Sequence, residues 1–304
     1  MFCLTATTTA GLHEIAVDEC KDELTDYTAY SRLANRGKPQ FREVIRKMSG
    51  MEMKHYDFWK KYCPDQVDKI KVSSLVVYYV LFMRFILGTS FAIKYLEKKE
   101  RSTIKKYDSI ANLIPSEDKT AFDEMVEDEK GHERDLAKEV EGSYLKYISF
   151  IVLGLADALV EIAGIHAGSL GIYKSTLITG LAGIIAGAAA SIAMASAAYA
   201  QAKQGFEGSA GLSAFYTGIS YFINAVILAT PYFLTDNKYL AIAVSLIFGI
   251  LIIAFISYYN SVLSEETFTR DFLELSGIML GATGALYVLG LLVSQILHIP
   301  PFTA

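Results

Sequence analysis

The chain has 304 residues, 52% of them apolar, and a formal net charge of −5 at pH 7. Charge is concentrated in the first half: of 28 Lys and Arg residues only four follow Lys146, and of 33 Asp and Glu residues only eight do. The sequence has no basic stripe or Arg-rich arm, which argues against nucleic acid as a partner. We therefore expect a water-soluble domain at residues 1–146 and a membrane domain at residues 147–304.

The N-terminal segment Met1–Leu12 has neither a basic start nor a long apolar core. We therefore expect no cleavable signal peptide and a soluble domain in the cytoplasm. The three cysteines, Cys3, Cys20 and Cys63, are scattered and form no Cys-x-x-Cys motif. They predict neither a disulfide framework nor a zinc or rubredoxin-type iron knuckle, and they fit a reducing compartment.

Periodic apolar residues predict four helical regions in the soluble domain. They are expected at residues 14–35, 40–62, 72–93 with a charged continuation from Lys94, and 117–147. Pro39 and Pro64 mark the breaks around the second region, and Ser116 is a suitable N-cap for the fourth.

The third region is long and apolar enough to resemble a membrane span. Arg84 lies at its middle, where an arginine would cost roughly 2.5–3.5 kcal/mol in a bilayer. We expect a buried or membrane-surface helix, with a true span as the alternative.

The acids and histidines of these helices form a recognisable set. It comprises Glu23 on the first helix, Glu52 and His55 on the second, Glu97 and Glu100 on the third, and Glu129 and His132 on the fourth. One Glu from each of two helices and a Glu-x-x-His from each of the other two is the ligand set with which ferritin-like bundles bind two iron or manganese ions. The i, i+3 spacing turns a helix by about 300°, so both side chains leave from one face and reach the same ion. Mixed carboxylate and imidazole ligands suit iron and manganese.

Other interpretations of these residues stay open. A single Glu-x-x-His is more often an exposed helix pair than a metal site, and it is the presence of two such pairs, with Glu23 and Glu97, that favours a metal site. Glu100 is either an additional ligand or a residue that faces water. His13 fits no ligand set, and we expect it at the surface.

Five apolar segments follow in the second half, and each is long enough to cross a hydrocarbon core of about 30 Å. They are expected near residues 147–173, 175–200, 212–234, 239–259 and 275–297. With the first domain inside, an odd number of spans places the tail at 298–304 outside. The few loop charges do not test this orientation.

The first of these spans contains Asp157 and Glu161, four residues apart and therefore on one helix face. Carboxylates in hydrocarbon are costly unless they face a cavity, a partner or a bound cation, so both are functional candidates. The alternative is a protonated, hydrogen-bonded pair used in packing. His166 points away from Asp157, and we expect it near the outer mouth or in a structural role. Met194, among small residues of the second span, is a soft ligand for Fe²⁺ or a gap-filler, and by itself packing is favoured.

Two sets of local strings resemble known families. Asp22–Tyr27 (DELTDY), Glu52–His55 (EMKH) and Glu127–His132 (EDEKGH) are similar to the ferritin-like, rubrerythrin-related domain of membrane-bound ferritins. Gly154–Glu161 (GLADALVE) and Ser191–Met194 (SIAM) are similar to motifs of vacuolar iron transporters, to which that domain is fused in this architecture. The resemblance implies an all-α fold, a ferritin-like four-helix bundle followed by a five-helix transmembrane domain.

The resemblance also implies roles for residues. In vacuolar iron transporters an aspartate and a methionine line the ion path of a dimer of five-span subunits that exchanges Fe²⁺ for protons. This implies the same role for Asp157 and Met194, with Glu161 as a companion. Two features depart from the family: Ala198 stands where many members have a glutamate, and only residues 201–211 occupy the place where plant relatives insert charged helices. The absence of rubredoxin-like cysteines weakens an interpretation as a complete rubrerythrin peroxidase.

The expected function is export of Fe²⁺, or alternatively Mn²⁺, from the cytoplasm in exchange for protons. We expect a homodimer embedded in the lipid of the plasma (inner) membrane, with two iron ions, or manganese, in each ferritin-like domain. A rival is a membrane-anchored di-iron ferroxidase or peroxidase, against which the pair Asp157 and Glu161 argues, because an anchor needs no acids. In a third interpretation the bundle only senses metal and gates the spans.

Overall fold

The computed structural model describes the backbone of residues 2–36, 39–140, 145–263 and 267–298. Within these ranges it also describes the side-chain surroundings, except at residues 2–10, 36, 39–41, 101–102, 132–140 and 145–146. The described residues form helices and no strand, which confirms the all-α prediction. The chain divides into two compact units, Met1–Gly142 and Ser143–Ala304.

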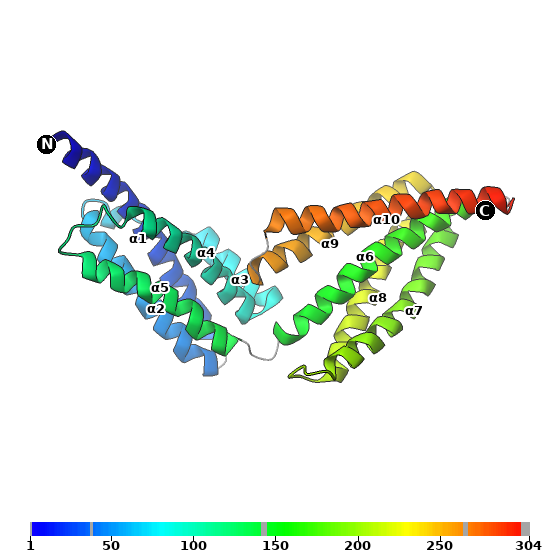
Figure 1. Ribbon diagram of the computed structural model, residues 1–304, viewed down its shortest axis with the longest axis horizontal. Coiled ribbons are helices and arrows are strands. Elements are labelled where there is room, and N and C mark those ends of the chain that lie inside the picture. Colours follow the sequence, from blue (N-terminus) through cyan, green and yellow to red (C-terminus); the bar gives the residue numbers. More distant parts are fainter. Residues whose placement is uncertain (1, 37–38, 141–144, 264–266, 299–304) are drawn as a thin grey trace. The chain divides into compact units, whose positions relative to one another are not determined.

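In its described part the first unit contains five α-helices (Figure 1). They are α1 (Phe2–Arg36), α2 (Pro39–Trp59), α3 (Ser74–Leu87), α4 (Thr89–Ile110) and α5 (Lys119–Val140), with 3₁₀ turns at Lys60–Tyr62 and Val67–Lys69. α1 packs against α2 and α4, and α5 packs against the same two helices, so these four form a bundle. Trp59, Tyr107 and Phe122 are buried together in an aromatic part of its core.

Some helix boundaries in this unit differ from the sequence prediction. The third helical region is not continuous, because Gly88 has φ +91°, a conformation that favours glycine, and it separates α3 from α4. With 14 residues, α3 is too short to cross a hydrocarbon core of about 30 Å. The fourth predicted helix is described as α5 from Lys119 to Val140, and α6 is described from Leu145; residues 141–144, which the prediction also covered, lie outside the described residues.

The second unit contains the five apolar helices (Figure 1). They are α6 (Leu145–Tyr173), α7 (Thr176–Ala202), α8 (Ala210–Leu234), α9 (Lys238–Leu263) and α10 (Phe268–Ile296). All five are long and apolar enough to cross a membrane, which indicates a multi-pass membrane protein. α10 begins earlier than the predicted Leu275, because Arg270 pairs with Glu274 one turn later (Nε–Oε1 2.9 Å) and supports a charged first turn.

Glycines allow the helices of this unit to approach closely. α10 packs along α6, and a Cβ atom on Gly290 would lie 2.3 Å from the backbone oxygen of Gly168. In α7, which packs along α8 and α6, Gly183 leaves the space that the buried ring of His166 fills. These glycines therefore have a packing role, as small residues do where membrane helices meet.

Gly290→Ala is expected to destabilise the second unit by about 1–3 kcal/mol, because the added methyl group would push α6 and α10 apart. Denaturant unfolding of the full chain in detergent, followed by circular dichroism, measures this change. Gly284→Ala on the same helix is the matched control, since no atom lies within 4 Å of its added Cβ. It should leave stability unchanged or raise it by up to about 1 kcal/mol. Equal stability of the two variants would contradict the close approach.

Candidate metal centre

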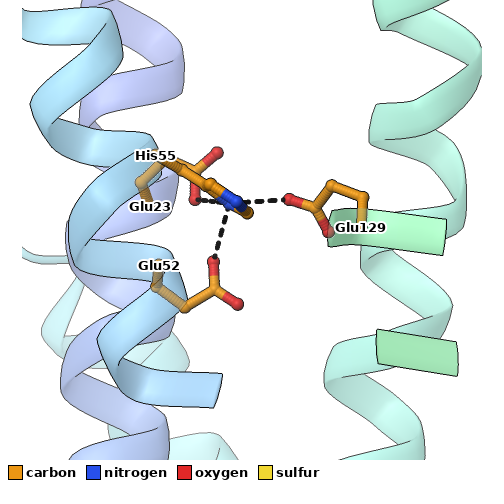
Figure 2. A group of neighbouring side chains, drawn as sticks. All are labelled: Glu23, Glu52, His55 and Glu129. Atoms are coloured by element: carbon orange, nitrogen blue, oxygen red, sulfur yellow. Dashed lines mark ion pairs between the residues drawn. The ribbon is translucent and has the colours of Figure 1, made fainter. Parts of the chain in front are cut away.

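Four potential metal ligands from three helices meet inside the bundle (Figure 2). Glu23 lies on α1, Glu52 and His55 lie on α2, and Glu129 lies on α5. One ligand atom of each residue lies within 4.8 Å of those of the other three. All four side chains are buried. We call these four residues the carboxylate cluster. The i, i+3 spacing places the two ligands of α2 on one face of that helix.

His55 occupies the middle of the carboxylate cluster. Its Nδ1 lies 3.1 Å from Glu129 Oε1, 3.6 Å from Glu23 Oε2 and 3.8 Å from Glu52 Oε2. Figure 2 shows the carboxylates on different sides of the imidazole, with Glu129 reaching across from the opposite helix. The imidazole thus stands where a single positive charge is close to all three acids.

Burial shifts the protonation of these groups. Burial lowers the pKa of His55, but hydrogen bonds to Glu129 and Glu23 and the negative charges of both carboxylates together outweigh this and raise it to about 10. Burial raises the pKa of Glu129 to about 7, although the hydrogen bond from His55 opposes the shift. Burial and then the neighbouring carboxylates raise the pKa of Glu52 well above its usual range. Without a bound cation, protons on His55 and Glu52 would therefore offset much of the negative charge.

Glu23 behaves in the opposite way. Burial acts to raise its pKa, but the hydrogen bond and the charge of His55, together with hydrogen bonds to Glu52 and Tyr107, outweigh burial, and the pKa is lowered. Glu23 is therefore the carboxylate of the cluster that stays ionised most readily.

The donor set fits a divalent transition metal. Ligand atoms at about 2.1 Å from one ion stand at most about 4.2 Å apart, so a small contraction would close the cluster on a single ion. Carboxylates with imidazole are the ligand chemistry of iron and manganese. Buried carboxylates are costly unless they are paired or bind a metal, and a dication would replace the protons that neutralise them.

The hydrogen bonds around the cluster include residues that the sequence did not single out. The Tyr107 hydroxyl lies 2.9 Å from Glu23 Oε1 and 3.1 Å from Glu19 Oε2. It also accepts a hydrogen bond from Trp59 Nε1 at 3.2 Å. Glu19 is buried and forms an ion pair with Lys106. Such contacts orient the Glu23 carboxylate. The sequence signal for Glu19 is its i, i+4 spacing from Glu23, which places both on one face of α1.

Two further predicted ligands of the bundle, Glu97 and Glu100, lie outside the carboxylate cluster. Glu97 and Glu100 are buried on α4; Glu97 Oε2 pairs with Lys94 Nζ at 2.8 Å, and Glu100 Oε1 accepts a hydrogen bond from the Tyr30 hydroxyl at 2.7 Å. The interpretation of Glu100 as a residue that faces water is wrong, because only 6% of it is exposed. The pKa of Glu52 is raised mainly by burial, and the next largest cause is the negative charge of Glu100. The side chain of His132, on α5, lies outside the described residues.

The predicted residues of the second unit lie on α6 and α7. Asp157 and Glu161 are exposed on α6, and the hydroxyl of Tyr221 on α8 donates a hydrogen bond to Glu161 Oε2 at 2.5 Å. Met194 on α7 is partly buried and packs against the apolar core of this unit. Ala198, one turn later, is buried in apolar surroundings. The structure therefore places the acid pair on a surface of the single chain.

A family model described as Rubrerythrin matches residues 15–140. No curated protein matches the chain. The match contains all four residues of the carboxylate cluster, and the predicted ferritin-like bundle is confirmed. A ferritin-like, rubrerythrin-related domain is thus followed in the chain by five apolar helices. The matched residues end before α6, so the likeness of the second unit to vacuolar iron transporters remains a prediction.

Binding of Mn²⁺ or Fe²⁺ to the carboxylate cluster should weaken as the pH falls from about 8 to about 6, because the ion binds neutral imidazole and ionised carboxylates. His55, with a pKa of about 10, is protonated throughout this range, and Glu129, with a pKa of about 7, becomes protonated within it. Binding should therefore release protons. Anaerobic calorimetry of the full chain in buffers with different ionisation enthalpies measures both the affinity and the proton release.

His55→Gln should lower this affinity roughly tenfold or more and remove the part of its pH dependence that comes from deprotonation of the imidazole. His13→Gln is the matched control, because His13 lies outside the cluster and pairs with Asp65 (Nε2–Oδ1 2.6 Å). An affinity that does not change with pH, or equal losses in both variants, would contradict the assignment.

Proposed function

We propose that this protein exports Fe²⁺, with Mn²⁺ as the alternative cargo, from the cytoplasm in exchange for protons. One observation carries the proposal: a single chain holds a buried carboxylate cluster in one unit and two acids on an apolar helix in the other. Acids in both places are costly unless a cation or a proton accompanies them. A chain that binds a dication in the bundle and passes it through the membrane would use both the carboxylate cluster and the acids of α6.

The acid pair supports a homodimer. Asp157 and Glu161 lie one turn apart on an exposed side of α6. An ionised carboxylate that faces lipid at the centre of a span costs roughly 2.5–3.5 kcal/mol, so another surface is needed to cover them. A second copy related by two-fold symmetry would bring four such acids together and line an ion path with them. Met194 is proposed as a further ligand of that path.

Proton exchange follows from the chemistry of such a path. Burial favours the protonated carboxylic acid, whereas a nearby cation favours the carboxylate. The acids of α6 can therefore hold either a dication or protons as the path opens to one side and then the other. The hydrogen bond from Tyr221 orients the carboxylate of Glu161 for this exchange.

The bundle is proposed to capture the metal ion before transport, or to gate the spans when metal is bound. Two iron ions, with manganese as the alternative, are proposed for each bundle. The first would be held by the carboxylate cluster. The ligands proposed for the second are Glu97, Glu100 and His132. Iron bound by such ligands would have coordination positions open to oxygen, peroxide or water.

The bundle is proposed to lie on the cytoplasmic side of the plasma (inner) membrane. The two described cysteines, Cys20 and Cys63, are free thiols, which fits a reducing compartment. Five spans would then place the C-terminal tail on the opposite side.

A second candidate is a membrane-anchored di-iron ferroxidase or peroxidase. The carboxylate cluster is the observation that favours it, because ferritin-like donor sets hold two iron ions with open positions. The acid pair on α6 favours transport, since an anchor needs no acids among its spans. Ferrous oxidation by the full chain, measured beside transport, separates these functions: rapid turnover with no transport supports the oxidase.

Asp157→Asn should lower Fe²⁺ uptake into proteoliposomes about tenfold or more, because loss of even an outer partner of a metal site costs roughly 10- to 100-fold. Uptake is followed with a Fe²⁺-sensitive dye under an imposed pH gradient. Asp236→Asn is the matched control, because Asp236 is exposed in the connection between α8 and α9. It should transport like the wild type. The proposal would be contradicted if Asp157→Asn took up Fe²⁺ at the wild-type rate and this rate did not depend on the pH gradient.

The double variant Glu52→Gln/His55→Gln separates the role of the bundle from that of the spans. If the bundle captures the metal ion or gates the spans, transport by this variant should fall at low metal concentration. It should approach the wild-type rate when metal is saturating. The concentration dependence of uptake measures this. Unchanged kinetics at every concentration would exclude both roles for the bundle while leaving transport through α6 intact.

A further inference from the structure

The outer face of α3 is apolar and exposed. Leu75 and Phe85 are 83% and 85% exposed, and Tyr78, Phe82 and Ile86 are each more than half exposed. Among the described residues of the first unit, every exposed large apolar side chain belongs to this helix. Monomeric soluble proteins rarely leave such a continuous apolar patch in water, so a partner surface covers it.

The geometry of α3 separates this face from its polar and buried residues. At about 100° per residue, the five exposed side chains fall within an arc of about 100°. Val77 and Val80 are buried on the opposite side, towards the bundle. Arg84 lies about 150° from the middle of the exposed arc. Arg84, which would make a membrane span costly, therefore points away from the apolar face.

A basic cavity lies at the N-terminal end of α3. Its volume is about 330 Å³, and it is lined by Val17, Lys21, Gln66, Lys69, Ile70 and Lys71. The lining includes three lysines and no acid. Lys71 precedes the first residue of α3 by only three positions. Next to the apolar face itself, the guanidinium of Arg32 lies 5.8 Å from the centroid of the Tyr78 ring.

Apolar side chains with lysines beside them complement one surface in particular, a bilayer with anionic headgroups. Amphipathic helices with a basic margin lie in the plane of such an interface, with the apolar face at the boundary between headgroups and acyl chains. Anionic lipids attract basic residues that lie near the membrane surface. The chain itself supplies the bilayer, because only residues 141–144 separate α5 from the first apolar helix.

We propose that α3 is a membrane-docking helix. Its apolar face inserts at the interface of the bilayer that the second unit spans, and the lysine-lined cavity receives the phosphate of an anionic lipid headgroup. This surface does not depend on transport or on metal binding. It would orient the bundle on the membrane whichever function the carboxylate cluster has.

Photo-crosslinking from the exposed face tests the docking. The full chain with p-benzoylphenylalanine in place of Phe85 is reconstituted in vesicles of phosphatidylcholine with phosphatidylglycerol, irradiated, and examined by mass spectrometry. The matched control carries the same group in place of Glu124, an exposed residue of α5. A lipid adduct several-fold more abundant at position 85 than at position 124 is expected. Equal lipid yields, or adducts at position 85 only to protein, either a second copy or the same chain, would overturn the proposal.

The headgroup part of the proposal has its own test. Lys69→Glu/Lys71→Glu should lower the yield of lipid adduct at position 85 several-fold in anionic vesicles and leave it unchanged in phosphatidylcholine alone. Both lysines are exposed, so the substitutions should not disturb folding, and circular dichroism checks this. A yield that is insensitive to the charge reversal in anionic vesicles would show that the cavity binds no headgroup.

Discussion

Repulsion among buried carboxylates is the constraint on which the bundle depends. Three glutamates and one histidine fill a small volume inside it, and Glu19, Glu97 and Glu100 are buried in the same bundle. Removing one partner of a buried ion pair typically costs about 3–5 kcal/mol, so the imidazolium of His55 is essential wherever no metal ion is bound. Protons and a dication are alternative ways to neutralise the same buried carboxylates. Metal affinity, local stability and pH are coupled for that reason.

The same constraint acts in the second unit, but the solvent differs. In the bundle, protein surrounds the acids on every side. On α6, Asp157 and Glu161 face outward from a helix that is otherwise suited to lipid. Packing among the spans relies on contacts of glycine with backbone, as between Gly168 and Gly290, and leaves those acids uncovered. Under the proposed function, a second copy of the chain would cover these acids, and two-fold symmetry would concentrate them along the proposed ion path.

One residue, Gly88, makes a single stretch of chain serve two environments. Its positive φ ends α3 and redirects the chain into α4, which then contributes Glu97, Glu100 and Tyr107 to the interior of the bundle. Without that break, the apolar residues of α3 and the acids of α4 would continue as one helix. The break lets the first part present an apolar face outward while the second packs inside the bundle.

The sequence by itself determined the helical class, the division into a charged and an apolar half, and the ligand types, because helical periodicity and i, i+3 spacing are local properties. Glu52 and His55 share a face on any helix that contains them. Only the tertiary structure decided that Glu23 and Glu129 reach the same point, and that Glu19 belongs to the hydrogen-bonded surroundings. Those outcomes depend on how helices distant in sequence pack: Tyr107 and Glu23 lie 84 residues apart and still share a hydrogen bond. Spacing along a chain carries no information about such distances, because they are set by the side chains that fill the space between helices.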